Sequence, residues 1–234
     1  MTHNFKKALI IGAGAGLSAS LARLFHSHGV EVALASRGVD DLAGLASEVS
    51  ATVHTCDASR REDITALFSD LDETGAPDIV VYNPSARVRG AITELDGAEV
   101  EHAIQITALG AFHAAQEAAK RMLPTKHGGI LFTGATAGVK AYGKSTTFAM
   151  GKFALRALAQ SLARELHPKG VHVGHFIIDG GIRNPNRPER VDAAENPDSM
   201  LDPDAIAREY WNLLTQHRSC WSWEVDLRPW VEKF

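Results

Sequence analysis

Phe148 and Lys152 are the two residues of this sequence whose types and spacing most directly suggest chemistry. They stand four apart in the segment from Ser145 to Glu165, which reads STTFAMGKFALRALAQSLARE. On a helix, side chains four apart project from the same side, one turn from each other. A lysine beside an aromatic ring indicates a proton-transfer pair, but phenylalanine has no proton to give. The pattern predicts a site built around a phenol in which the phenol is missing.

The segment that carries this pair is patterned as a helix. Apolar residues recur along it at spacings of three and four, namely Leu155, Leu158, Ala159, Leu162 and Leu166. Such spacing places an apolar stripe against a core. The sequence that follows, His167-Pro168-Lys169-Gly170, is typical of a helix end.

Short β-branched runs alternate with amphipathic stretches along the whole chain. The expected strands are 8–11, 30–35, 52–56, 79–82, 130–133 and 171–178, with a last strand among the aromatic residues of 221–230. We expect Gly29 to end the first helix and the segment 59–62, Ser-Arg-Arg-Glu, to form a capping box for the third. A repeated β-α-β order requires crossover connections. It predicts an α/β fold over residues 1–234, a single-domain, Rossmann-like doubly wound parallel sheet flanked by helices.

Composition and charge narrow the classes of partner. Lys and Arg total 24 against 28 for Asp and Glu, with no basic arm, which argues against nucleic acid or a membrane surface as the partner. Cys56 and Cys220 are too few for a disulfide framework and have no metal-ligand spacing. The first residues, MTHNFKK, contain no signal-peptide core. We expect a soluble, cytoplasmic protein, without a metal site.

Two histidines on the stretch between the fourth and fifth strands also suggest a metal or a base. His102 and His113 are eleven residues apart, so they share a helix face but are about three turns from each other. One ion cannot bind both. We interpret them as surface or interface histidines.

The loops after the strands are where a doubly wound sheet binds ligands. Gly12-Ala-Gly14-Ala-Gly16-Leu17-Ser18 lies between the first strand and the first helix, where backbone N–H groups can hold a pyrophosphate. The alternative is a plain tight turn. Ser36 and Arg37 end the second strand and suit a 2′-phosphate, which favours NADP over NAD unless Arg37 is only a solvated turn residue. Asp57 follows the third strand and could accept from the adenine amino group or cap the next helix.

With these features in this order, the chain resembles the short-chain dehydrogenase/reductase superfamily from Ala8 to the helix after Pro203. The family motif TGxxxGxG is matched by residues 11–18, where Ile11 and Ser18 depart from it. The NNAG motif is matched by residues 82–85, of which only Asn is kept. The resemblance implies that Lys152 contacts the nicotinamide ribose hydroxyls. The candidate cofactor-binding residues are Gly12, Gly14, Gly16, Leu17, Ser36, Arg37, Asp57, Asn83, Lys152 and Gly180.

The family performs catalysis with an Asn-Ser-Tyr-Lys tetrad, and here three of its positions differ. The matching residues are Thr107, Ala135, Phe148 and Lys152. The family's Pro-Gly after the sixth strand is replaced by Asp179-Gly180. The following segment, 181–200, is rich in Pro, Asn and charge, as expected for a mobile lid over a substrate.

Three explanations of the incomplete tetrad remain open. The substrate could need little acid catalysis, which is worth about 10²–10⁴ in rate. Another group could supply the proton; the candidates are Tyr142, Tyr82, Ser145, Thr136 and Asp179. The protein could also bind NADP without catalysis, as a sensor or partner subunit.

The catalytic candidates are Lys152, Tyr142 and Thr136. The resemblance implies an NADP-dependent oxidoreductase that transfers hydride to a small carbonyl, imine or activated alkene, and that assembles as a homodimer or homotetramer. The alternatives are the non-catalytic NADP-binding protein and a cofactor-retaining lyase or isomerase.

Overall fold

A seven-stranded parallel sheet forms the centre of the protein, in a computed structural model that describes residues 4–184, 186–192 and 194–232. The strand order is β3-β2-β1-β4-β5-β6-β7, and every neighbouring pair is parallel. The strands are β1 (Lys7–Ile11), β2 (Glu31–Ser36), β3 (Thr52–Thr55), β4 (Ile79–Tyr82), β5 (Gly129–Thr133), β6 (His172–Ile178) and β7 (Glu224–Leu227). This confirms the doubly wound α/β fold.

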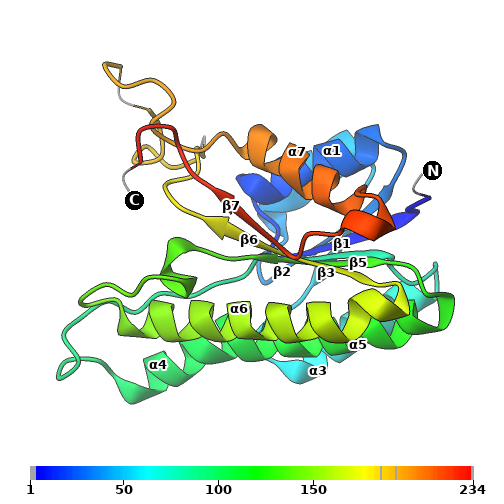
Figure 1. Cartoon of the computed structure of the whole chain (residues 1–234), viewed down its shortest axis with the longest axis horizontal. Coiled ribbons are helices and arrows are strands. Elements are labelled where there is room, and N and C mark those ends of the chain that lie inside the picture. Colours follow the sequence, from blue (N-terminus) through cyan, green and yellow to red (C-terminus); the bar gives the residue numbers. More distant parts are fainter. Residues whose placement is uncertain (1–3, 185, 193, 233–234) are drawn as a thin grey trace.

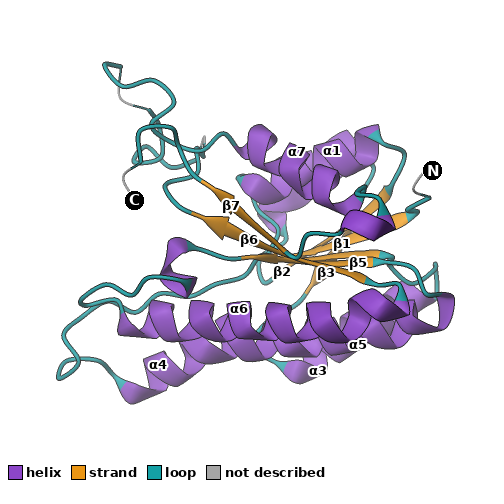
Figure 2. Ribbon diagram, in the orientation of Figure 1, coloured by secondary structure: helices purple, strands orange, loops and turns teal. Residues whose placement is uncertain are grey.

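Helices cover both faces of the sheet, as parallel crossovers require. Figure 1 shows α1 (Leu17–Ser27) and α7 (Pro203–Leu214) on one face, where α2 (Ala43–Val49) also packs. The other face carries α3 (Arg61–Asp72), α4 (Gly97–Ile104), α5 (Gly110–Thr125) and α6 (Thr146–Leu166). Figure 2 shows the strands as one layer between these two layers of helices. Each face therefore has its own apolar core.

The local signals in the sequence place most element ends correctly. The six expected strands are present, with bounds that differ by at most one residue, and β7 lies within the expected aromatic segment. Gly29 and Gly170 follow α1 and α6 with φ of +76° and +89°, which is the left-handed geometry that glycine adopts readily. None of the described helices is both long and apolar enough to span a membrane.

The expected capping box at the start of α3 is wrong. The N-cap is Arg60, whose side chain makes no capping hydrogen bond to the backbone of the helix. The hydroxyl of Ser59 instead donates to Asp57 Oδ1 over 2.7 Å, and Asp63 Oδ2 accepts from the Asp57 N–H over 3.1 Å. A carboxylate two residues earlier thus engages the hydroxyl that would have capped the helix.

Before α5 the chain forms a π-helix, Gln105–Leu109, and α5 then begins at Gly110 in direct contact with the sheet. The hydroxyl of the buried Tyr82 donates to the Ile106 carbonyl oxygen within this π-helix. A methyl group on Gly110 would overlap the Ala58 carbonyl oxygen and the Tyr82 hydroxyl. The absence of a side chain at Gly110 is therefore what lets the loop after β3 and the start of α5 meet.

We predict that Gly110→Ala lowers the free energy of unfolding by about 2–3 kcal/mol, because backbone rather than a flexible side chain would have to move. Gly44 of α2 is the matched control, since a methyl group there meets nothing within 4 Å. Gly44→Ala should leave stability unchanged or raise it by up to about 1 kcal/mol. Urea unfolding of both variants makes the comparison, and equal stabilities would contradict the close approach.

Candidate active site

Two adjoining cavities open at the carboxyl ends of the strands, around the point where the strand order reverses between β1 and β4. The first, which we call the Arg37 cavity, has a volume of about 970 Å³. The second, the Lys152 cavity, has about 550 Å³. Gly12, Pro84 and Arg87 line both cavities, so the two form one continuous depression.

The turn after β1 is held in shape by close packing and by hydrogen bonds. Gly12 has φ of +80°, and a methyl group on it would lie 2.8 Å from the Pro84 nitrogen. The Ser18 hydroxyl donates to the Gly12 carbonyl oxygen over 3.0 Å, and Asn83 Nδ2 donates to Ser18 Oγ over 2.9 Å. Ser18, which departs from the family motif, thus links Asn83 to the glycine turn. Asn83 both supports this turn and lines the Lys152 cavity.

The start of α1 offers backbone N–H groups to the Lys152 cavity. Gly14, Gly16 and Leu17 line it, and a methyl group on Gly14 would meet nothing within 4 Å. The N-cap Gly16 supplies no side-chain cap, and the first turn of α1 contains no acidic residue. Free amide groups at the positive end of a helix dipole are suited to an anion such as a pyrophosphate. The turn therefore fits the phosphate-binding role expected of it.

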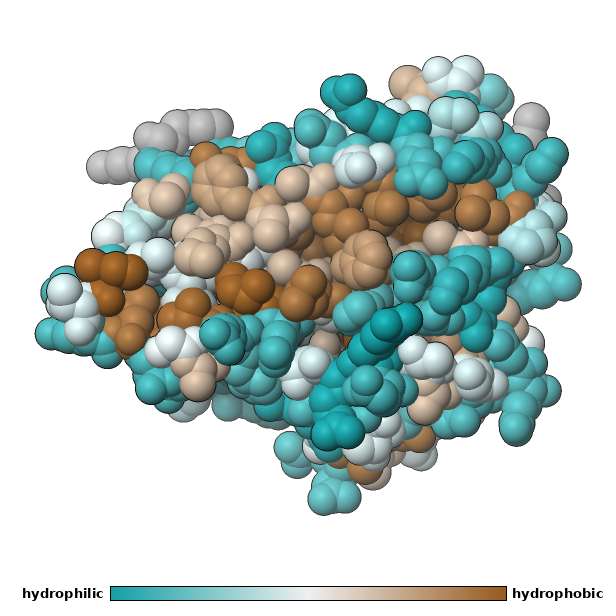
Figure 3. All heavy atoms as spheres, turned by 90° about the horizontal axis from the view of Figure 1, so that it is seen from below, coloured by the Kyte–Doolittle hydropathy of each residue, from teal (hydrophilic) through white to brown (hydrophobic). Residues whose placement is uncertain are grey.

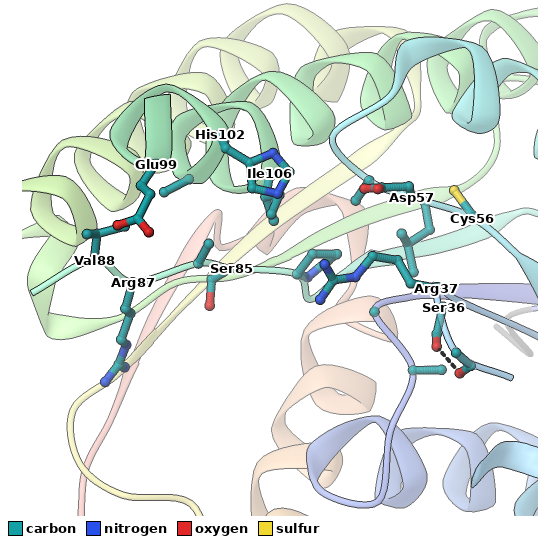
Figure 4. A pocket seen from close by; sticks show the side chains of 18 of the residues that line it. Ser36, Arg37, Cys56, Asp57, Ser85, Arg87, Val88, Glu99, His102 and Ile106 are labelled. Atoms are coloured by element: carbon teal, nitrogen blue, oxygen red, sulfur yellow. Dashed lines mark hydrogen bonds between the residues drawn. The ribbon is translucent and has the colours of Figure 1, made fainter. Parts of the chain in front are cut away.

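Ser36 and Arg37 lie at the far end of the Arg37 cavity, as the sequence predicts. In Figure 4 the Arg37 side chain points across the cavity, below Asp57. The Ser36 hydroxyl donates to the Gly38 carbonyl oxygen over 2.5 Å, so its proton is engaged within the turn. Arg37 is consequently the group at this end that is directed into the cavity.

Asp57 stabilises the turn before α3 and lines the Arg37 cavity, and its contact with an adenine amino group stays a prediction. Its Oδ1 accepts from the Ser59 N–H over 2.9 Å and from the Ser59 hydroxyl, which forms the turn before α3. Its carboxyl also lines the Arg37 cavity. Burial opposes ionisation of Asp57, but the two Ser59 hydrogen bonds and the charge of Arg37 outweigh it and hold the pKa of this carboxyl below its ordinary value.

Lys152 is fully buried in the protein and lines the cavity named after it. Its Nζ donates to the Thr133 carbonyl oxygen over 2.6 Å and lies 5.9 Å from the centre of the Phe148 ring. Burial, followed by repulsion from Arg87, lowers the pKa of Lys152 to about 7. An amine with that pKa exchanges a proton readily near neutral pH.

Apolar side chains surround the place where the sequence suggested a missing phenol. Ala135, Ala137 and Phe148 form one small buried cluster, and Ala135 and Phe148 line the Lys152 cavity. The fourth tetrad position, Thr107, is buried in the π-helix, where its Oγ1 accepts from the Ala86 N–H over 3.1 Å. Lys152 is therefore the ionisable group of the tetrad positions that reaches this cavity.

The other candidate proton donors are outside the linings of both cavities. Tyr142 is exposed and is not part of the lining of either cavity. Thr136 is also outside both linings, and its hydroxyl donates to the Asp179 carboxylate. Ser145 is the N-cap of α6 and makes no side-chain capping bond. Burial raises the pKa of Tyr82 well above its ordinary value.

The segment 181–200 lies over the Lys152 cavity, although Pro185 and Ala193 fall outside the described residues. Ile182 pairs with Leu201 in an isolated β-bridge, and Arg183 forms ion pairs with Asp192 and Asp202. Gly180 precedes the segment with φ of +146°, and a methyl group there would lie 2.9 Å from Pro229 Cδ. The cavity residues from this segment are Ile182, Arg183, Asn184, Asn186, Arg187 and Arg190. Whether the segment moves as a lid stays a prediction.

Sequence reasoning missed Arg87. It follows β4 in the loop that begins with Asn83, and its guanidinium carbon lies 3.9 Å from the centre of the Phe148 ring. The one signal in the sequence for a role of Arg87 was its place just after the carboxyl end of a strand.

Within the described ranges no group of three or more His, Cys, Asp or Glu could hold a metal ion. His102 lines the Arg37 cavity from α4.

Comparison with known proteins gives a consistent set of relatives. The family described as short chain dehydrogenase matches residues 6–192. An uncharacterized oxidoreductase of Staphylococcus aureus is 29% identical over 233 residues, and the match covers 96% of this chain and 97% of that protein. The cyclic-di-GMP-binding biofilm dispersal mediator protein of Escherichia coli is 31% identical over 170 residues, 72% of this chain and 70% of its own length.

Solved structures agree with these relatives in fold. A short-chain dehydrogenase from Rhodopseudomonas palustris is 32% identical, with a TM-score of 0.81, over 96% of this chain and 99% of that one. A metagenomic short-chain oxidoreductase in complex with NADP is 26% identical, with a TM-score of 0.82, over 96% and 97% of the two chains. The glycine turn, the buried lysine on α6 and these matches together show that the chain belongs to the short chain dehydrogenase family of oxidoreductases.

Proposed function

We propose that the protein is an NADP-dependent reductase whose active site lacks the tyrosine and serine of its family. It transfers hydride to a small organic substrate, a carbonyl, imine or activated alkene. The observation that carries the proposal is the position of Lys152, buried with a pKa of about 7, in the same cavity as the open amide groups of the glycine turn. A phosphate-binding turn and a proton-exchanging amine are what a hydride-transfer site needs.

The residues present fit NADP along the whole depression. Gly14, Gly16 and Leu17 would hold the pyrophosphate, Arg37 the 2′-phosphate, and Asp57 the adenine amino group. When bound, NADPH supplies the hydride. The related metagenomic oxidoreductase was solved with NADP, which supports the same cofactor here.

Lys152 has two tasks in this proposal. Its ammonium form would donate hydrogen bonds to the nicotinamide ribose hydroxyls, and its Nζ proton would be available to the substrate. A pKa of about 7 keeps both protonation states populated near neutral pH. The apolar cluster around Phe148 favours substrates whose reduction leaves no bare alkoxide, such as an iminium ion or a polarised alkene.

A non-catalytic, NADP-binding protein is the second candidate. The apolar replacements Ala135 and Phe148 favour it, because neither can orient or protonate a carbonyl oxygen. The name of the Escherichia coli relative describes a binding protein, which supports considering it here. A survey of NADPH oxidation against carbonyl, imine and activated alkene substrates decides between the two candidates.

A second copy of the chain would cover an apolar face of the molecule. Figure 3 shows a band of apolar side chains on the helical face seen from below. Leu109, Phe112, Met150 and Phe153 are between 43% and 51% exposed, from the π-helix, α5 and α6. A patch of this kind marks an interface, and we propose a homodimer or homotetramer.

The free cysteines, Cys56 and Cys220, support a cytoplasmic location.

We predict that NADPH binds more tightly than NADH by about 1.5–3 kcal/mol, the scale of a charge-assisted hydrogen bond to the 2′-phosphate. Arg37→Ala should remove most of this difference and leave NADH affinity unchanged. Arg61→Ala, an exposed arginine on α3, is the control. Calorimetric titration measures both cofactors, and equal affinities in the parent protein would refute the NADP assignment.

The low pKa of Lys152 predicts a pH dependence of stability in the cofactor-free protein. Below pH 7 the folded protein holds a buried charge, whereas between about pH 7 and 10.5 folding releases a proton and stability rises with pH. The gain in stability from Lys152→Met should therefore be larger at pH 6 than at pH 9 by about 2–3 kcal/mol. Urea unfolding measures it, with Lys169→Met, an exposed lysine, as control. A gain independent of pH would contradict the shift.

Phe148→Tyr would place a hydroxyl one turn from Lys152, and Ala135→Ser would orient a carbonyl oxygen. We predict that the double variant gains NADPH-dependent reduction of activated ketones and aldehydes over a parent with little such activity. Each single variant should gain less than half of the effect in logarithmic terms. Phe153→Tyr on the same helix is the control, and initial rates on a small carbonyl panel are the measurement.

Two results would change the interpretation of that experiment. A parent already fast on ordinary ketones would mean that another residue supplies the proton, and Tyr142 and Thr136 would be the first to mutate. A double variant that binds NADPH but reduces none of the carbonyl compounds would favour the non-catalytic candidate.

A further inference from the structure

The lining of the Lys152 cavity carries a surplus of positive charge. Among its described residues are four arginines and one lysine, and there is no aspartate or glutamate. The arginines are Arg87, Arg183, Arg187 and Arg190. A cavity with one sign of charge concentrates ligands of the opposite sign.

One of the four arginines is neutralised within the protein and three are not. Arg183 pairs with Asp192 over 3.3 Å and also with Asp202. For Arg87, Arg187 and Arg190, no carboxylate of the described chain lies within ion-pair distance. These three side chains, which we call the arginine trio, hold positive charge that a ligand can match.

The arginine trio converges from separate parts of the chain. Arg87 comes from the loop after β4, and Figure 4 shows it pointing away from Glu99 toward the segment that follows β6. Arg187 and Arg190 come from that segment. Partial burial, then repulsion from Arg89, Arg190 and Arg187, lowers the pKa of Arg87 below its ordinary value. The like charges are thus close enough to repel one another, which costs stability in the absence of a ligand.

Arg87 also fixes where the charge lies relative to the reacting end of the site. Its guanidinium carbon is 3.9 Å from the centre of the Phe148 ring, in a cation–π contact. The Nζ of Lys152 lies 5.9 Å from the centre of the same ring. An anionic group held by Arg87 would therefore be next to the position where hydride is delivered.

We propose that the arginine trio is a recognition subsite for an anionic group on the substrate, a carboxylate or a phosphate monoester. The inference rests on the proposed function, because it names the substrate class of the same site. Arginine suits this task, since its planar fork of donors matches both groups bidentately. Arg87, stacked on Phe148, would be held ready for that geometry.

The pyrophosphate of the cofactor is the competing anion. The amide groups at the start of α1 already offer it a site, whereas Arg87 lies at the Phe148 end of the cavity. The two roles for the arginine trio, substrate binding and pyrophosphate binding, predict different effects when an arginine is replaced. A substrate subsite predicts unchanged NADP⁺ affinity, and a pyrophosphate site predicts weaker NADP⁺ binding.

The test is calorimetric titration of the NADP⁺-saturated protein with benzoate, phenyl phosphate and the neutral benzamide. We expect both anions to bind at least about tenfold more tightly than benzamide. Arg87→Gln and Arg190→Gln should each weaken anion binding about tenfold and leave benzamide and NADP⁺ unaffected. Arg208→Gln, an exposed arginine on α7, is the matched control. Added salt should weaken the binding of the anions only.

The comparison between the two anions identifies the group that the subsite prefers. Tighter benzoate binding indicates a carboxylate substrate, and tighter phenyl phosphate binding indicates a phosphate ester. Anions that bind no better than benzamide would overturn the subsite. Parallel losses of NADP⁺ and anion affinity in the arginine variants would overturn it as well, because the arginines would then serve the cofactor.

Failure of the proposed function gives a different result. If NADP⁺ does not bind to the parent protein, the reductase proposal is wrong, and the same titrations on the cofactor-free protein still measure the subsite. Thermal unfolding of each variant excludes loss of folding as the cause. Arg87→Lys, which keeps the charge but not the planar fork, should retain part of the anion affinity.

Discussion

The close approach of the chain at Gly12 and Pro84 is the constraint on which the site depends. At this point the strand order reverses, and a methyl group on Gly12 would lie 2.8 Å from the Pro84 nitrogen. Ser18 and Asn83 hold the turn against β4 by hydrogen bonds. Because the turn cannot move away from β4, the free amide groups of α1 and the loop that carries Arg87 face the same depression. The glycine turn and the loop that carries Arg87 are thereby set at a fixed separation.

The two cavities of this depression differ in the charged residues that line them. The Arg37 cavity contains charges of both signs, because Arg37, Arg87 and Arg89 line it together with Asp57 and Glu99, whereas the Lys152 cavity contains basic groups without acidic ones among its described residues. Lys152 responds to that surplus through its lowered pKa, since burial and Arg87 both disfavour its charged form. An anion bound beside Arg87 would reverse the second effect and raise the pKa of Lys152. Substrate binding and proton supply would then be coupled electrostatically.

The apolar cluster at Phe148 gives the site its chemical character. Ala135 and Phe148 stand at the positions that the family resemblance matches to the catalytic serine and tyrosine, and the Phe148 ring contacts the Arg87 guanidinium. Under the proposed function, a charged hydrogen-bond donor would take the place of a proton donor. Such a site would be better suited to holding an anion near the nicotinamide than to protonating an alkoxide.

The sequence by itself determined the strands, the ends of α1 and α6, the glycine turn and the pairing of Phe148 with Lys152, because these depend on periodicity and on residues within a few positions of each other. The capping box at Ser59 failed because Asp57 competes for the hydroxyl, which a motif does not weigh. Only the tertiary structure decided that Thr136 donates to Asp179, that Lys152 is buried with a pKa of about 7, and that Arg87 lines the same cavity as Arg187 and Arg190. Those arrangements join residues that lie far apart in the sequence, from 19 positions for Lys152 and Thr133 to about a hundred for Arg87 and Arg190. Their geometry is set by packing of the sheet and helices rather than by any local pattern.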